Sequence, residues 1–156
     1  MIWLRTLLFT VLVPAAVTIY LPWWILSQGR APGPSGLRWL AALPIALGAA
    51  LYAWCAVDFA LAQGTPAPID PPKELVARGP YRWSRNPMYL GVATVLFGEA
   101  VWFGSSALLV LGLVVVAAFH AFVTLYEEPS LRLRFGEVYE SYLRSVPRWL
   151  PRRPRP

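Results

Sequence analysis

Residues 79–91 read GPYRWSRNPMYLG, and the organisation of the chain follows from this stretch. Cationic and aromatic side chains precede Asn86 and Pro87, and the sequence then turns apolar without interruption. Asn is a favoured N-cap and Pro is favoured at the first helical position, so a helix is predicted to begin here. A helix start presents free N–H groups and partial positive charge, which suit a carboxylate or phosphate. The alternative is a membrane-interface anchor, where Arg, Trp and Tyr are common.

The composition indicates an integral membrane protein. The 156 residues are 57% hydrophobic and 14% charged, with eight tryptophans, and several stretches reach the roughly 20 apolar residues that cross a bilayer. The single cysteine, Cys55, excludes a disulfide framework, and no metal site is predicted because no His/Cys cluster or H-E-x-x-H motif occurs. The net charge of +6 suits anionic lipid on one membrane face rather than nucleic acid.

The predicted fold is all-α, with about four membrane-spanning helices. The predicted spans are residues 6–26, 37–61, 87–103 and 107–126. The first span is too long for a signal peptide and is expected to be retained. A tight turn at residues 104–106 makes the last two spans an antiparallel hairpin, and the proline-rich residues 63–86 form a long shaped loop. An amphipathic helix over residues 131–143 is predicted to lie in the membrane interface.

The distribution of basic residues predicts the orientation. Two of the 14 basic residues, Arg30 and Arg38, fall at the loop between the first two spans, and the others fall on the opposite side. The positive-inside rule therefore places both termini in the cytoplasm. The small size favours a bacterial inner membrane.

Polar side chains within the spans are candidates for a functional site. On a helix, His120, Thr124 and Glu127 share one face, and such a stripe is costly unless it faces protein or water. The alternative is that His120 bonds within the bundle and Glu127 reaches the headgroups. Asp58 lies near the cytoplasmic end of its span, and Glu99, near the outer end of another, is expected to be structural.

The acidic pair Glu127 and Glu128 precedes Pro129, which disfavours helical geometry at the residue before it. The helix is therefore expected to break or bend at the pair. Two adjacent carboxylates can bind a cationic ligand, or they can pair with Arg85 or Arg132.

Two blocks of sequence resemble a known family. The first is G-P-Y-R-x-x-R-N-P-x-Y-x-G, which begins at Gly79, and the second is E-E-P-x-L-x-x-x-F-G-x-x-Y-x-x-Y-x-x-x-V-P-R-W-L-P, which begins at Glu127. In order and spacing they are similar to the isoprenylcysteine carboxyl methyltransferase-like and phospholipid methyltransferase-like integral membrane enzymes. The similarity extends over residues 64–151.

The resemblance implies a membrane methyltransferase that uses S-adenosylmethionine at the cytoplasmic face. It divides the chain into a two-span region, residues 1–62, and a methyltransferase region, residues 63–156. The residues it implies for the cofactor, together with His120 from the polar stripe, are Tyr81, Asn86, Pro87, Tyr89, Leu90, Gly91, His120, Glu127 and Glu128. It implies Arg144 or Arg148 as the catalytic group that handles the acceptor.

The chemistry of the cofactor agrees with these residues. Carboxylates suit its ammonium or ribose hydroxyls, and free helix amides suit its carboxylate. Where the eukaryotic carboxyl methyltransferases have His, this chain has Asn86, which can bond but cannot act as a base. The acceptor stays open between a carboxylate, an amine and a thiol. The alternative class is a non-catalytic membrane scaffold, or a lipid-binding or transporter-associated protein.

Overall fold

The computed structural model describes residues 12–29, 38–61 and 75–151, which contain helices and turns and no strand. The elements in chain order are η1 (Ala16–Tyr20), α2 (Leu21–Ser27), α3 (Arg38–Leu61), η2 (Gly79–Arg82), α4 (Pro87–Phe103), α5 (Ser106–Phe122), η3 (Val123–Glu127), α6 (Glu128–Phe135) and α7 (Glu137–Ser145). Here η1 and η3 are π-helical turns and η2 is a 3₁₀ turn. The predicted all-α fold is confirmed for these residues.

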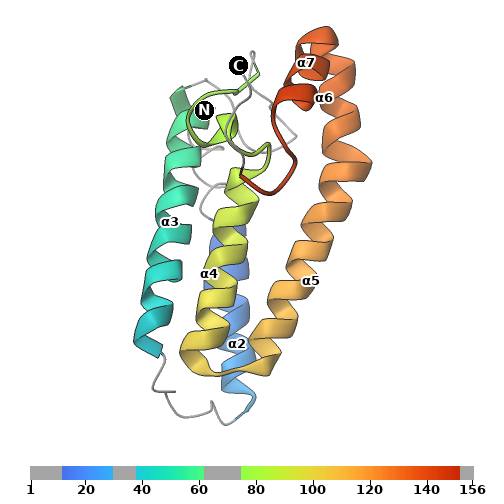
Figure 1. Cartoon of the computed structure of the whole chain (residues 1–156). Coiled ribbons are helices and arrows are strands. Elements are labelled where there is room, and N and C mark those ends of the chain that lie inside the picture. Colours follow the sequence, from blue (N-terminus) through green and yellow to red (C-terminus); the bar gives the residue numbers. More distant parts are fainter. Residues whose placement is uncertain (1–11, 30–37, 62–74, 152–156) are drawn as a thin grey trace.

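The long helices stand side by side as a bundle (Figure 1), and α3 and α4 make the most extensive contact. Because α4 and α5 run in opposite directions, the start of α4 lies at the same end as the last turns of α3 and α5. Helices α6 and α7 lie at that end too. The topology therefore gathers the two sequence blocks that carry the family resemblance.

Glycines allow the close approach of α3 and α4. A Cβ added at Gly48 would lie 2.6 Å from the carbonyl oxygen of Gly91, and one added at Gly91 would lie 2.8 Å from that of Gly48. No side chain fits at such distances, so the two backbones are in direct contact. This contact fixes α4, and with it the start of α4, against α3.

The predicted hairpin of α4 and α5 is confirmed. Gly104 ends α4 in the left-handed conformation, with φ 58°, which suits a residue without a Cβ. Ser105 caps α5 because its hydroxyl accepts a hydrogen bond from the amide of Leu108 at 3.3 Å. Two consecutive residues thus stop one helix and start the next.

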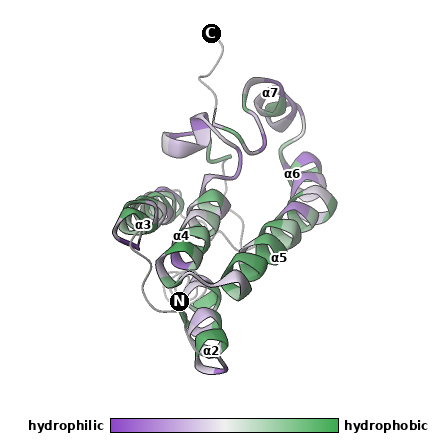
Figure 2. Cartoon of the chain, turned by 60° about the horizontal axis from the view of Figure 1, so that its bottom comes forward, coloured by the Kyte–Doolittle hydropathy of each residue, from purple (hydrophilic) through white to green (hydrophobic). Residues whose placement is uncertain are grey.

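Two of the four predicted spans are long and apolar enough to cross a membrane: α3, and the continuous helix Ser106–Phe135. In each, only 17% of the most apolar window is buried, so the apolar side chains face outward, as expected for contact with lipid. Figure 2 shows that the residues along α5 are mostly hydrophobic. The helices Leu12–Ser27 and Pro87–Phe103 are shorter apolar helices. Residues 6–11 of the first predicted span lie outside the described residues.

Of the break or bend predicted at Glu127 and Glu128, the break is wrong, and a π-turn interrupts the regular α-helix there. The helix continues from α5 through η3 into α6, and the amide of Glu128 bonds to the carbonyl of Val123, five residues back. A proline ring normally clashes with the carbonyl four residues back. The wider π-turn just before Pro129 shifts the preceding carbonyls relative to the proline ring, so the helix continues past Pro129.

The predicted amphipathic helix over residues 131–143 is also wrong as a single element. Gly136, with φ 51°, separates α6 from α7. The apolar face of α7 packs inward, where Tyr139, Tyr142 and Val146 form a buried cluster with Leu131 and Phe135 of α6. Its periodicity reflects a core inside the protein, and among its apolar residues Val138 faces outward.

We expect Gly48→Ala to lower the free energy of unfolding by about 1–2 kcal/mol. The added methyl would collide with the Gly91 carbonyl, and overpacking usually costs about 1–3 kcal/mol, of which the gain in helix propensity offsets about 1 kcal/mol. Unfolding in detergent measures the change. Ala49→Leu is the control because Ala49 is exposed one residue along α3. Equal stability of Gly48→Ala and wild type would contradict the close contact.

Candidate functional site

Asn86 stands at the N-cap position of α4, as predicted, but its side chain makes no capping bond. Its Nδ2 instead donates to the carbonyl oxygen of Arg148 at 3.0 Å. The hydroxyl of Ser84 donates to the same oxygen at 3.2 Å and accepts from the amide of Asn86 at 3.2 Å. The predicted side-chain cap is therefore wrong, because a distant carbonyl competes for the amide.

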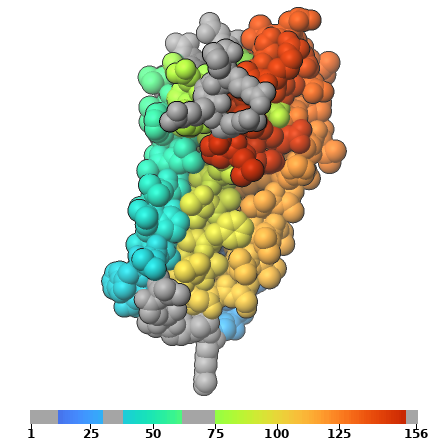
Figure 3. Space-filling model, in the orientation of Figure 1, coloured from blue at the N-terminus to red at the C-terminus, as the bar shows by residue number. Residues whose placement is uncertain are grey.

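These bonds attach residues 147–151, which we call the C-terminal strap and which follow the C-cap of α7 at Val146, to the start of α4. The amide of Arg85 donates to the carbonyl of Pro147 at 2.9 Å, so the backbones of the two segments are joined directly. Figure 3 shows the strap, in red, reaching from α7 onto α4.

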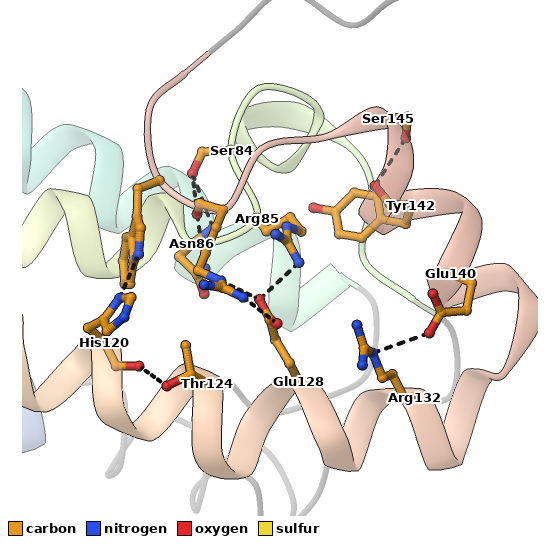
Figure 4. A network of polar contacts seen from close by, with 12 residues as sticks. Ser84, Arg85, Asn86, His120, Thr124, Glu128, Arg132, Glu140, Tyr142 and Ser145 are labelled. Carbon is orange, nitrogen blue, oxygen red and sulfur yellow. Dashed lines mark hydrogen bonds and ion pairs between the residues drawn. The ribbon is translucent and has the colours of Figure 1, made fainter.

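Glu128 lies between two arginines from different segments (Figure 4). Its Oε1 accepts from Nη1 of Arg85 at 2.9 Å and from Nε of Arg148 at 2.8 Å, and its Oε2 accepts from Nη2 of Arg148 at 2.9 Å. The Glu128 side chain is only 9% exposed. The hydrogen bond to Glu128 raises the pKa of Arg148. The predicted alternatives for Glu128 were a cationic ligand and an ion pair with arginine, and the structure shows the ion pair.

Glu127 has a different environment from its neighbour. Its Oε2 accepts a hydrogen bond from the phenol of Tyr89 at 2.9 Å. The Tyr89 ring packs on Phe119 of α5, with ring centroids 4.6 Å apart. Tyr89 thus joins α4 to α5, and Glu127 carries no ion pair within the described residues.

His120 contacts the strap. The indole Nε1 of Trp149 donates to Nδ1 of His120 at 3.2 Å, and the rings lie 6.1 Å apart. With Nδ1 as acceptor, a neutral imidazole carries its proton on Nε2. Thr124, predicted on the same face, turns its hydroxyl back to the carbonyl of His120 at 2.7 Å.

Tyr81 lies in the core behind the start of α4. Its ring meets Phe59 edge to face, and its carbonyl accepts from the phenol of Tyr142 at 2.7 Å. Burial raises the pKa of Tyr81 and raises that of Tyr139 to about 12. The Tyr142 bond ties α7 to η2, so the strap begins from a fixed point.

The structure places the remaining predicted residues in different surroundings. Pro87 is buried at the start of α4, and Leu90 is half-buried one turn later. Gly91 faces the backbone of α3. Arg144 is exposed on α7 and bonds to Ser141 of its own helix, so it is not brought to the other residues.

Two further acidic residues lie away from the acidic pair. Asp58 pairs with Arg78 at 3.6 Å, and the Arg78 guanidinium also donates to the Asp58 carbonyl at 2.9 Å. This contact attaches the chain before η2 to the end of α3. Oε2 of Glu99 is buried on α4 and has no hydrogen-bond partner among the described residues.

Several polar groups at the start of α4 and on Glu127 make no hydrogen bond within the described part of the chain. Nε of Arg85 is buried without a hydrogen-bond partner in the described part of the chain. Within the same residues, no hydrogen bond is made by the amides of Met88 and Tyr89 in the first turn of α4, or by Oε1 of Glu127. Donors on one side and a carboxylate oxygen on the other match a ligand that carries both a carboxylate and an ammonium group.

Sequence reasoning missed the contributions of Ser84 and Trp149. Both lie inside the two sequence blocks described above, in the segments S-R-N and P-R-W. Ser84 pairs with Arg148, 64 positions away, and Trp149 pairs with His120, 29 positions away. No local pattern encodes such separations.

Comparison with protein families gives one match: residues 37–138 match the model of the phospholipid methyltransferase family. No curated protein and no solved structure matches the chain. The matched range covers α3 to the first residues of α7, and it includes the start of α4 and the acidic pair.

We expect Tyr142→Phe to lower the free energy of unfolding by about 1–3 kcal/mol, because it leaves the buried carbonyl of Tyr81 without its donor. Chemical denaturation in detergent measures the change. Tyr126→Phe is the matched control, since Tyr126 is half exposed and should lose almost nothing. Equal effects of the two substitutions would show that α7 is not fixed by this bond.

Proposed function

Because the chain belongs to the phospholipid methyltransferase family, we propose that it transfers a methyl group from S-adenosylmethionine to a lipidic or small acceptor at a membrane surface. The observation that carries the proposal is the position of Glu127. This carboxylate is held by Tyr89 beside the start of α4, and the basic groups around it belong to its neighbour Glu128. It is therefore free to meet a cation.

The proposed cofactor site uses groups on both sides of Glu127. Oε1 of Glu127 would accept from the ammonium or a ribose hydroxyl, and the Met88 and Tyr89 amides would bind the carboxylate. The buried Nε of Arg85 supports the same anionic end. The Tyr89 ring offers a π face to the sulfonium or the adenine. The bound cofactor supplies an electrophilic methyl group.

Other residues in the resemblance would support this site from behind. The Tyr81 ring and Gly91 pack toward α3, and Pro87 and Leu90 shape the first turn of α4. Asn86 and His120 would act through the strap that they hold. Their proposed role is to fix the geometry, which matters because direct methyl displacement depends on holding donor and acceptor in line.

For the acceptor we propose a lipid with a polar headgroup that reaches the site from the bilayer. The outward-facing apolar surfaces of α3 and α5 support a position in the membrane. Of the two arginines considered for the acceptor, Arg148 adjoins the acidic pair and Arg144 does not. We retain Arg148 as the residue that handles the acceptor. Its Nη1 makes no hydrogen bond among the described residues and can bind a headgroup phosphate. The basic charge of the loops supports the cytoplasmic face.

The alternative is a non-catalytic membrane scaffold, in which Glu127 and Glu128 would only form ion pairs. The structure of Glu128 fits that description. Glu127 does not, since its partner is the neutral phenol of Tyr89. A half-buried acid without a cationic partner among the described residues does not follow from a scaffold role, whereas a cofactor site explains it.

Calorimetric binding of S-adenosylhomocysteine to the detergent-purified protein tests the proposal. We expect micromolar binding by the wild type and an affinity at least tenfold lower for Glu127→Gln, equivalent to about 1.4 kcal/mol. Glu137→Gln, on the exposed first turn of α7, is the matched control and should bind as the wild type does. Failure of the folded wild type to bind would contradict the proposal. Equal affinities of wild type and Glu127→Gln would remove Glu127 from the site.

A further inference from the structure

The strap is held at its inner end by contacts from two segments, residues 84–86 and Glu128. Ser84 and Asn86 donate to the Arg148 carbonyl, and the Arg85 amide donates to the Pro147 carbonyl. The Arg148 guanidinium in addition makes two hydrogen bonds to Glu128. Backbone and side chain of the strap are therefore fixed together.

Glu128 has little capacity for a cationic ligand. Both of its oxygens accept from guanidinium groups, and its side chain is almost fully buried. Two arginine charges face one carboxylate charge, so the cluster of Arg85, Glu128 and Arg148 is net positive. An ammonium group brought to Glu128 would be repelled by the two arginines at close range.

We infer that Glu128 is a positioning residue: through Arg148 it fixes the C-terminal strap across the start of α4, and the strap forms one wall of the methyltransferase site. This inference rests on the proposed function and divides the acidic pair. Glu127 serves the cofactor, whereas Glu128 acts through the strap and does not contact the cofactor.

The outer end of the strap identifies the wall that it forms. Trp149 contacts His120 of α5, whereas Asn86 and Ser84 hold the preceding residue at the start of α4. The strap therefore bridges the two helices that Tyr89 also joins. His120 lies two turns before Glu127, about 10 Å along the helix. An acceptor that approaches Glu127 between α4 and α5 would pass Trp149.

The two ends of the strap differ in strength. The inner end has charge-assisted hydrogen bonds to a buried carboxylate, which are about twice as strong as neutral ones. The outer end has one neutral hydrogen bond, from Trp149 to the exposed His120. Loss of Glu128 should therefore loosen the strap, because only neutral hydrogen bonds from Trp149 and from residues 84–86 would remain.

The chain contains a matched control ion pair. Arg132 of α6 and Glu140 of α7 lie 3.2 Å apart, with side chains 55% and 43% exposed. Within the described residues, neither makes a hydrogen bond or ion pair to Glu128 or to the strap, and Arg132 acts on Glu128 only through its charge. The double variant Arg132→Gln/Glu140→Gln removes an ion pair of the same chemistry and leaves the hydrogen bonds of Glu128 in place.

Hydrogen exchange at the Arg85 amide reports directly on the strap, because this amide bonds to the Pro147 carbonyl. The Val146 amide bonds to Tyr142 within the same end of α7 and serves as an internal reference for general unfolding. We expect Glu128→Gln to speed Arg85 exchange at least tenfold with Val146 exchange within twofold of wild type. Affinity for S-adenosylhomocysteine should fall less than fivefold. The control double variant should change none of these values.

Glu127→Gln should give the opposite pattern, with affinity at least tenfold lower and Arg85 exchange within twofold of wild type. Where Glu128→Gln does not fold, Arg148→Gln tests the same connection, since it removes the strap's side of the ion pair. Faster exchange at Arg85 in that variant supports the inference.

The inference is overturned if Glu128→Gln lowers affinity as much as Glu127→Gln while Arg85 exchange stays at the wild-type rate. Glu128 would then be a ligand of the cofactor. It is also overturned if Arg85 and Val146 exchange speed up equally, since the residue would then act on global stability. If the folded wild type does not bind S-adenosylhomocysteine, the proposed function fails alone, because Arg85 exchange still decides whether Glu128 fixes the strap.

Discussion

The arrangement of this end of the bundle depends on the buried carboxylate of Glu128. It holds Arg85, which precedes α4, and Arg148, which lies in the strap. A charge buried to this extent must be paired, and removing one partner of such a group typically costs about 3–5 kcal/mol. The ion pairs therefore do more than add stability. They bring the two sequence blocks into one place, and they leave Glu127 as the acid that is not neutralised by arginine.

Helical geometry at the junction of the π-turn η3 and α6 explains how two adjacent acids acquire different partners. Successive residues on a helix point about 100° apart, so Glu127 is directed to Tyr89 while Glu128 is directed to the arginines. The same turn lets the helix pass Pro129 without ending. Single π-turns within α-helices occur frequently at functional sites, and here the turn ends on the proposed cofactor residue.

The long apolar stretches and the turn at Gly104 and Ser105 predicted most of the fold, because periodicity and capping are local properties. The sequence predicts the local conformation and hydrogen bonding at Asn86, Pro129 and Gly136 less well. Asn86 gives its side chain to a carbonyl far along the chain, which local cap preference does not anticipate. The helix passes Pro129 through a π-turn, and Gly136 divides the predicted helix over residues 131–143 into α6 and α7, which pack on each other. For the site, sequence placed the two blocks together, but which acid meets which arginine is decided by tertiary contacts. The four spans, the two-region division and the orientation remain predictions.

The central claim is that the two neighbouring glutamates have separate roles at one methyltransferase site. An experimental structure of the protein with S-adenosylhomocysteine tests this most directly. The account predicts the ligand between Glu127 and the first turn of α4, with its amino acid end near the Met88 and Tyr89 amides. Glu128 should remain bound to Arg85 and Arg148. A ligand that displaces either arginine from Glu128, or that binds away from Glu127, would contradict the account.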